Sequence, residues 1–278
     1  MSNIVMSNED KIFYKSKDGT KLCGIFLIPK VIKGYVLLAH GINVDKNEWE
    51  DFFVDFAQEL FKKGYASFRF DFRGHGESGG SQREMTIEGE TLDIAASIEQ
   101  ISARWNGNTS IVGMSFAAGP SIIYSTKEKP KINCIVLLCP VLDYVSTFLK
   151  PTVPWGKESF NKRGFEDLDK KGFLLLDGEF QLGAKIIEEF KVIKPYELLK
   201  DIDLPVLVIH GNKDSMVPFK LAKKYGKPNK QSEFVAIKNA DHGFTDITDE
   251  TGKSGKSIQN RKKVIEEGVA WIEKWSKL

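Results

Sequence analysis

A serine at the junction between a strand and a helix constrains the fold of this chain more than any other feature. A β-branched run leads into residues 113–119, GMSFAAG, and a helical pattern continues over 117–125. Ser115 therefore lies on a strand-to-helix turn, where a helix N-terminus aims free N–H groups and its positive dipole end at the hydroxyl. Gly113 and Ala117 supply the small neighbours that such a turn needs, although the usual motif has glycine in place of Ala117. The pattern predicts a nucleophile elbow, with a serine N-cap in an ordinary βα loop as the alternative.

Apolar runs that alternate with helical patterns predict the fold class. Strands buried on both faces are expected at 35–39, 66–70, 110–112, 132–138, 205–209 and 234–237. Helical spacing of apolar residues is found over 49–63, 87–105 and 264–275. This alternation predicts an α/β fold with a mostly parallel central sheet and helices on both faces. Asp18 and Gly19, between two strand-like runs, predict an antiparallel hairpin at one edge.

Residues 141–200 break this alternation. They contain many aromatic residues, glycines and prolines, and they are far longer than an ordinary βα connection. Because aromatic side chains leave water only by covering something, we expect an inserted cap over the C-terminal edge of the sheet. An inert surface excursion is the alternative. The predicted division is the first part of an α/β core at 1–140, an inserted cap at 141–200 and the second part of the core at 201–278.

The composition argues against several classes of partner. The chain has 40 Lys and Arg against 38 Asp and Glu, which gives no reason to expect nucleic acid or an acidic membrane surface. The three cysteines lack a paired spacing and indicate reduced, buried thiols. Residues 1–10 lack the pattern of a signal peptide, and no segment has the apolar length needed to cross a bilayer. We expect a cytoplasmic protein that acts on a small molecule, without nucleic acid or membrane as partner; a homodimer is left open.

A base and an acid can be assigned to the serine from their order along the chain. A serine hydroxyl needs an imidazole to take its proton, and the imidazole needs a carboxylate to fix its tautomer. After an elbow, the order is nucleophile, acid and then histidine. His242 follows the last predicted strand, and Asp214 closely follows the strand before it. Asp214 is the preferred acid and Asp143 the alternative, since both follow the C-terminal end of a strand.

An oxyanion hole requires two N–H donors beside Ser115. The backbone N–H of Phe116, first in the helix, is one candidate. The other should come from the loop after the 35–39 strand, where Gly41 lets the backbone approach closely, so we assign it to the N–H of Ile42.

The remaining histidines are assigned to loop structure. His40 and His210 each end a strand before a glycine, and His75 lies in a glycine-rich loop. No ligand-spaced pair such as H-x-H occurs, so we expect neither a metal nor a cofactor.

Five stretches, in this order, resemble the α/β-hydrolase superfamily over nearly the whole chain: residues 40–41, 71–78, 113–117, 210–214 and 241–243. Within it, the chain resembles the bacterial carboxylesterases that include the cinnamoyl (feruloyl) esterases, which share a serine-aminopeptidase-type hydrolase profile. The resemblance implies a Ser115, Asp214 and His242 triad, an oxyanion hole at Ile42 and Phe116, and a compact cap after the sixth strand.

The residues and the resemblance together predict a serine hydrolase. It would cleave carboxylic esters, hydroxycinnamoyl (feruloyl) esters among the candidates, through an acyl-enzyme intermediate. A peptidase or amidase, or a thioesterase or acyltransferase, with the same triad is the alternative. A non-catalytic homologue that only binds a ligand is a further alternative, which the complete set of triad residues disfavours.

Overall fold

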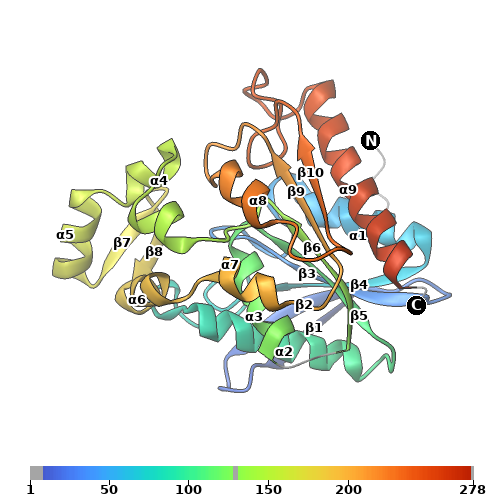
Figure 1. Ribbon diagram of the computed structural model, residues 1–278. Helices are drawn as coiled ribbons and strands as arrows, with labels where there is room; N and C mark the ends of the chain where they lie inside the picture. Colours follow the sequence, from blue (N-terminus) through green and yellow to red (C-terminus); the bar gives the residue numbers. More distant parts are fainter. Residues whose placement is uncertain (1–8, 128–130, 277–278) are drawn as a thin grey trace.

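Eight strands form one sheet whose pairing follows the predicted pattern. The computed structural model describes residues 9–127 and 131–276 (Figure 1). In spatial order the strands are β1 (Glu9–Lys15), β2 (Lys21–Leu27), β4 (Tyr65–Asp71), β3 (Gly34–Ala39), β5 (Thr109–Met114), β6 (Ile132–Leu138), β9 (Val206–Gly211) and β10 (Glu233–Ile237). β1 and β2 form an antiparallel hairpin and β2 runs antiparallel to β4, whereas every pairing from β4 to β10 is parallel. The predicted mostly parallel sheet with an antiparallel edge is confirmed.

Helices cover both faces of this sheet. α1 (Phe52–Lys63) and α9 (Gly255–Trp275) pack against one face; α2 (Ile87–Ser102), α3 (Ala118–Lys127) and the short α8 (Phe219–Tyr225) pack against the other (Figure 1). β3, β4, β5 and β9 are buried along their whole length. Strands covered on both faces need apolar residues on both, which is why these strands read as nearly continuous apolar runs.

One predicted helix begins later than expected. The helix expected over 49–63 starts at Phe52, because Glu48, Glu50 and Asp51 adopt left-handed φ values of 63°, 53° and 57°. Its apolar face is buried against the sheet as the spacing predicted. The deviation is therefore confined to the loop that precedes the helix.

The region from 141 to 200 is more regular than its sequence suggested. It contains a π-helical turn (Val145–Leu149), α4 (Pro154–Ser159), α5 (Lys162–Lys171), the hairpin strands β7 (Phe173–Leu176) and β8 (Phe180–Gly183), α6 (Ala184–Val192) and α7 (Pro195–Leu198). α4, α5, α6 and the hairpin lie to one side of the main sheet (Figure 1). The helices have four to ten residues each and alternate with short strands and turns, and the sequence pattern did not separate them. We call residues 141–200 the insertion.

The insertion has an aromatic core that continues into the main domain. Phe148 stacks on Phe190 with ring centroids 4.6 Å apart, and Tyr144 stacks on Phe190 at 5.1 Å. All three rings lie 5.4–6.0 Å from the ring of Phe116, which follows Ser115. The carboxylate of Glu189 also accepts a hydrogen bond from the N–H of Ile87, at the start of α2. The insertion is thus attached to the sheet beside the candidate nucleophile.

The cysteines and the candidate membrane-spanning segments can be compared with the structure. All three cysteines are free and buried, as predicted. Within 9–127 and 131–276, no helix combines the length and apolarity required to cross a membrane. Residues 1–8, on which the expected absence of a signal peptide largely rests, lie outside the described residues.

Candidate active site

Ser115 sits in a sharp turn between β5 and α3. Its φ is 52°, in the left-handed region, and a short 3-10 turn, Ser115–Ala117, connects the strand to the helix. A Cβ on Gly113 would lie 2.8 Å from the Oγ of Ser121, closer than real Cβ contacts, so glycine is required there. Ala117 is fully buried in the turn, where its methyl group is accommodated. The backbone therefore has the strained geometry expected of a nucleophile elbow.

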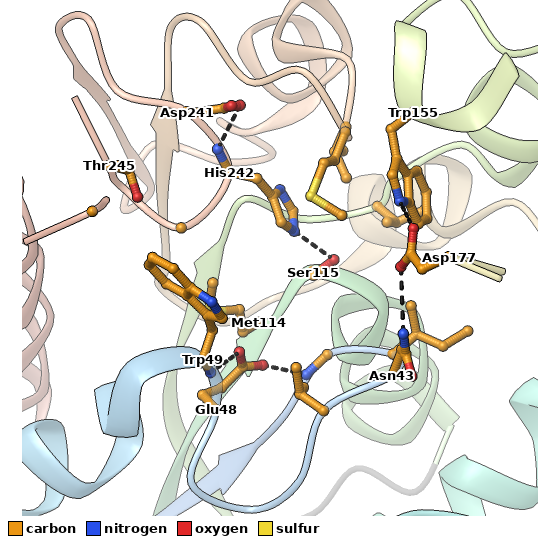
Figure 2. A pocket seen from close by; sticks show the side chains of 18 of the residues that line it. Asn43, Glu48, Trp49, Met114, Ser115, Trp155, Asp177, Asp241, His242 and Thr245 are labelled. Atoms are coloured by element: carbon orange, nitrogen blue, oxygen red, sulfur yellow. Dashed lines mark hydrogen bonds between the residues drawn. The ribbon is translucent and has the colours of Figure 1, made fainter. Parts of the chain in front are cut away.

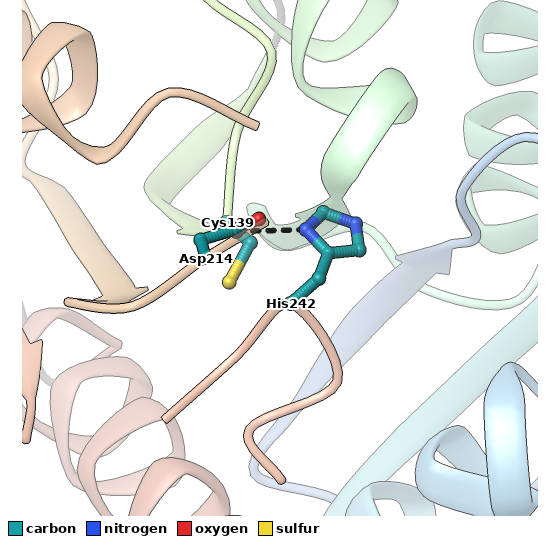
Figure 3. Close-up of side chains that lie close together, drawn as sticks. All are labelled: Cys139, Asp214 and His242. Atoms are coloured by element: carbon teal, nitrogen blue, oxygen red, sulfur yellow. Dashed lines mark hydrogen bonds and ion pairs between the residues drawn. The ribbon is translucent and has the colours of Figure 1, made fainter. Parts of the chain in front are cut away.

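The three side chains assigned from the sequence form one continuous chain of hydrogen bonds. Ser115 Oγ lies 3.0 Å from His242 Nε2, and His242 Nδ1 lies 2.8 Å from Asp214 Oδ2 (Figure 2, Figure 3). An ionised carboxylate can only accept, so Nδ1 carries the proton and Nε2 is free to accept from the serine hydroxyl. The serine is 8% exposed and lines the pocket.

The order of strands explains why these residues meet. Ser115 follows β5, Asp214 follows β9 and His242 follows β10, and the strands run parallel in the order β5, β6, β9, β10. Parallel strands end at the same edge of a sheet, so side chains far apart in the sequence converge there.

Asp214 is fixed by several donors. Its Oδ1 accepts from the N–H groups of Met216 and Val217 at 2.9 and 2.7 Å. Nε2 of His210 lies 2.9 Å from Oδ2, although not in line for a hydrogen bond. Burial alone would raise the pKa of Asp214, but the two imidazoles of His242 and His210 outweigh burial and lower it well below its usual range. The acid is therefore held in its ionised form.

Asp143, the alternative acid, is occupied elsewhere. Its carboxylate accepts hydrogen bonds from the backbone N–H and the hydroxyl of Ser146, at 3.1 and 2.7 Å. It fixes the turn that begins the insertion.

The imidazole of His242 is more basic than an isolated one. Burial disfavours its charged form, but the charge and hydrogen bond of Asp214 raise its pKa above the usual 6.5, with Glu48 and Asp241 adding to the effect. Asp241 also accepts from the N–H of His242 at 2.8 Å and from the N–H of Ser215 at 2.6 Å. It thereby joins the loop of the base to the loop of the acid. In the sequence, Asp241 is visible only as part of the 241–243 motif, which does not indicate this role.

The loop after β3 lies directly against Ser115. A Cβ on Gly41 would be 3.2 Å from the Cβ of Ser115, so the backbone approaches as closely as predicted. The ring of His40 donates from Nδ1 to the Gly41 carbonyl at 2.7 Å and accepts at Nε2 from the N–H of Phe72 at 3.0 Å. Among the described residues, none accepts a hydrogen bond from the N–H of Ile42.

Residues 71–78 support this loop instead of contributing chemistry. Asp71 accepts from both the backbone N–H and the ammonium of Lys46, each at 2.8 Å. His75 Nε2 accepts from the N–H of Asn43 at 3.4 Å. Burial lowers the pKa of His40 to about 4 and that of His75 to about 3, so both rings stay neutral as their acceptor roles require. The structural role assigned to both histidines agrees with these contacts.

A cysteine lies behind the acid and the base. The thiol of Cys139 and the facing atoms of Asp214 and His242 all lie within 4.8 Å of one another (Figure 3). Such a donor set resembles a zinc site, but ligands around a tetrahedral zinc with bonds near 2.0–2.1 Å are about 3.3 Å apart. The acid and the base are 2.8 Å apart. Their spacing is that of a hydrogen-bonded pair.

A pocket of about 600 Å³ opens above Ser115. The insertion contributes apolar walls through Val141, Phe148 and Trp155. Asp177, at the tip of the β7–β8 hairpin, accepts from Trp155 Nε1–H at 2.6 Å and from the Asn43 amide at 3.4 Å (Figure 2). The insertion therefore contacts the loop after β3 directly.

The charged groups that line the pocket are acidic. They are Glu48, Asp177, Asp241, Asp246, Asp249 and Glu250. Among the described residues lining the pocket there is no lysine or arginine.

Comparison with known proteins identifies the family. Residues 30–171, just over half of the chain, match the serine aminopeptidase family S33. The chain belongs to this family. It is a hydrolase of the α/β-hydrolase superfamily and has the fold of that superfamily.

Individual relatives are distant. An α/β-hydrolase superfamily protein of Bacillus subtilis, YisY, is 26% identical over 212 residues, which cover 66% of this chain and 77% of YisY. The bifunctional esterase/perhydrolase DCH of Acinetobacter calcoaceticus is 23% identical, covering 78% of this chain and 87% of DCH. The structure of Est1E of Butyrivibrio proteoclasticus with bound ferulic acid has a TM-score of 0.72 at 18% identity, covering 94% of this chain and 99% of Est1E. That likeness shows the fold.

Replacing the acid tests its assignment. Asp214→Asn should lower kcat for p-nitrophenyl acetate by about 10⁴, because the amide stabilises the wrong imidazole tautomer. Asp143→Asn, which removes a carboxylate in the insertion turn, should change kcat less than about threefold. Steady-state rates of both variants, with folding checked by circular dichroism, give the comparison. The reverse ranking would move the acid to Asp143.

Proposed function

We propose that this protein is a serine carboxylesterase that works through an acyl-enzyme intermediate. The observation that carries the proposal is the unbroken hydrogen-bond chain from Ser115 Oγ through His242 to Asp214, at 3.0 and 2.8 Å. A serine on a left-handed turn, paired with a base that is itself fixed by a buried carboxylate, meets the geometric requirements of nucleophilic catalysis.

In the acylation step, His242 Nε2 takes the proton of Ser115 as its oxygen attacks the ester carbonyl carbon. The negative charge on the carbonyl oxygen is held by the N–H groups of Ile42 and Phe116, and Asp214 stabilises the imidazolium. Collapse of the tetrahedral intermediate breaks the bond to the alkoxy group, which leaves as the alcohol with the proton from His242. The serine then carries the acyl group as an ester.

In the deacylation step, the same groups act on water. His242 takes a proton from a water molecule, which attacks the acyl carbon, and the resulting oxyanion occupies the same hole. Ser115 leaves with the proton from His242, and the carboxylic acid is released. Each oxyanion donor in such a site contributes roughly 3–4 kcal/mol of transition-state stabilisation.

The insertion is the proposed acyl-binding cap. Phe148 and Trp155 form apolar walls of the pocket, and the aromatic core behind them fixes their positions. Flat aromatic acyl groups, such as hydroxycinnamoyl groups, have the shape and polarity that such walls favour.

Removing the nucleophile tests the proposal. Ser115→Ala should abolish hydrolysis of p-nitrophenyl acetate while the circular dichroism spectrum stays unchanged, because the triad acts as a unit. A fluorophosphonate probe should label the wild type at Ser115 and leave the variant unlabelled. Full activity in the variant, or labelling at another residue, would refute the proposed mechanism.

Replacing one cap side chain tests the acyl-binding role. Trp155→Ala should lower kcat/KM for methyl ferulate about tenfold relative to p-nitrophenyl acetate, since contacts in an apolar pocket are worth about 1–3 kcal/mol. Phe165→Ala, an aromatic truncation in the insertion outside the pocket lining, is the matched control. An unchanged ratio between the two esters in Trp155→Ala would leave the insertion without a role in specificity.

The acidic lining predicts discrimination by charge. A p-nitrophenyl hemisuccinate should be hydrolysed at least about tenfold less efficiently than the neutral butyrate, because its carboxylate meets acidic side chains in a partly enclosed pocket. Glu250→Lys should narrow this gap, whereas Glu266→Lys, outside the pocket lining on α9, should not. Equal kcat/KM for the two esters at low salt would show that the lining does not act on the acyl group.

Aminopeptidase activity is the second candidate. It is favoured by the family match and by the acidic lining, which would accept an α-amino group. Aminoacyl-p-nitroanilides tested beside the esters separate the two functions, and faster turnover of the anilides would replace the esterase proposal.

A further inference from the structure

Glu48 has a backbone conformation that side chains rarely adopt. Its φ is 63° and its ψ is 175°, a region that is essentially reserved for glycine. The side chain is nevertheless a glutamate, and it is buried, with 8% exposed. Strain of this kind persists where the surroundings impose it, and it gathers at functional sites. Glycine would remove the strain, so the carboxylate must contribute something that a glycine lacks.

The carboxylate of Glu48 is aimed at the loop beside Ser115. One oxygen accepts from the N–H of Gly41 at 2.5 Å and the other from the N–H of Trp49 at 3.1 Å (Figure 2). A Cβ on Gly41 would lie 3.2 Å both from this carboxylate and from the Cβ of Ser115. Gly41 therefore lies close to both the carboxylate and the candidate nucleophile.

We propose that Glu48 is a positioning residue of the oxyanion hole. It holds the N–H of Gly41 while His40 holds the carbonyl of the same residue, so Gly41 is fixed on both sides. In a trans peptide the carbonyl and the next N–H point in opposite directions. The N–H of Ile42 is thereby directed away from His40 and kept without an acceptor among the described residues. This inference rests on the proposed esterase function.

The charge of Glu48 alone does not explain its position. A negative group beside the hole would oppose the oxyanion, although it also favours the imidazolium of His242 that forms in the same step. Burial raises the pKa of Glu48, and the two N–H donors and His242 act in the opposite direction. The benefit lies in geometry: donors that are fixed before the reaction need no reorganisation as charge develops.

Glu48→Gly gives the main test, because it removes the carboxylate and the backbone strain together. We expect kcat for p-nitrophenyl acetate to fall by about 10- to 100-fold, less than the 10²–10³ seen when a donor is deleted, because the donor is misaligned and still present. KM should stay within about twofold. The affinity for phenylboronic acid, which forms a tetrahedral adduct with the serine, should fall in parallel with kcat. The melting temperature should change little, because relief of the strain offsets the loss of the acceptor for the N–H groups of Gly41 and Trp49.

Two further variants separate the possible causes. Glu48→Gln keeps an acceptor for the N–H of Gly41 and should retain more activity than Glu48→Gly. Glu50→Gln makes the same charge change two residues away, at an exposed side chain, and should behave as the wild type. If the glycine variant does not fold, Glu48→Met, which keeps the length but has no carboxylate, carries the same comparison.

The outcomes distinguish this inference from the esterase proposal. If the wild type neither hydrolyses esters nor reacts with fluorophosphonate, the esterase proposal and the positioning role of Glu48 are both refuted. If the wild type is active and Glu48→Gly, or Glu48→Met in its place, retains wild-type kcat and boronate affinity, only the positioning role is overturned. A glycine variant with a lower melting temperature and unchanged kcat would assign Glu48 to stability instead.

Discussion

The parallel pairing of β3 with β5 is the constraint on which the rest of the site depends. Ala39 pairs with Gly113 in the register of these two strands. Two residues beyond each partner, Gly41 and Ser115 come into contact at the same edge of the sheet. The chain reverses its direction of travel across the sheet at this point, because β4 lies on one side of β3 and β5 on the other. Such switch points leave a crevice beyond the strand ends, and both Ser115, the candidate nucleophile, and the loop after β3 occupy it.

Backbone strain is concentrated around this crevice. Ser115, Cys139 and Glu48 all have left-handed φ, at 52°, 43° and 63°, and each directly follows a strand or precedes the helix that packs on the sheet. Conformations of this kind cost about 1–3 kcal/mol each and need a rigid surrounding to persist. The sheet supplies that rigidity, since β3, β5 and most of β6 are fully buried between helices. The rigid sheet therefore allows strained backbone conformations at the C-terminal ends of its strands.

The sequence predicts the parts of this molecule that depend on periodicity and chain order. The buried strands, the edge hairpin and the placement of Asp214 and His242 after β9 and β10 follow from apolar runs and from the positions of turn residues. The roles of these side chains stay predictions, but their meeting was foreseeable because parallel strands end at one edge. Glu48 was not foreseeable. It directly precedes the helix predicted over 49–63, and nothing in the sequence indicates its left-handed φ or its hydrogen bond to the N–H of Gly41.

The short elements of the insertion were missed for a different reason. Helices of four to ten residues and four-residue strands follow one another closely within 141–200, so no single period extends over the region. The aromatic content still indicated that residues 141–200 cover something, because a shared aromatic core does not depend on the period of any one helix. Its side chains pack on Phe116, the residue after Ser115. The same argument could not identify Asp177, whose hydrogen bonds cross between the insertion and the loop after β3.

The acidic lining of the pocket gives a reason for the many hydrogen bonds that hold the loop after β3. Six carboxylates line the pocket, and among the described lining residues no lysine or arginine faces them. Burial lowers the pKa of His242, but Asp214 raises it, and two of the lining carboxylates, Glu48 and Asp241, add to the increase. In the proposed mechanism these carboxylates would oppose the oxyanion, which would rely on backbone N–H dipoles. A dipole stabilises charge only while it points at the charge, so it must be fixed before the charge appears. The segment 40–48 is held in this way by hydrogen bonds of His40, His75, Lys46 and Glu48, so its backbone N–H groups are fixed before such a charge would develop.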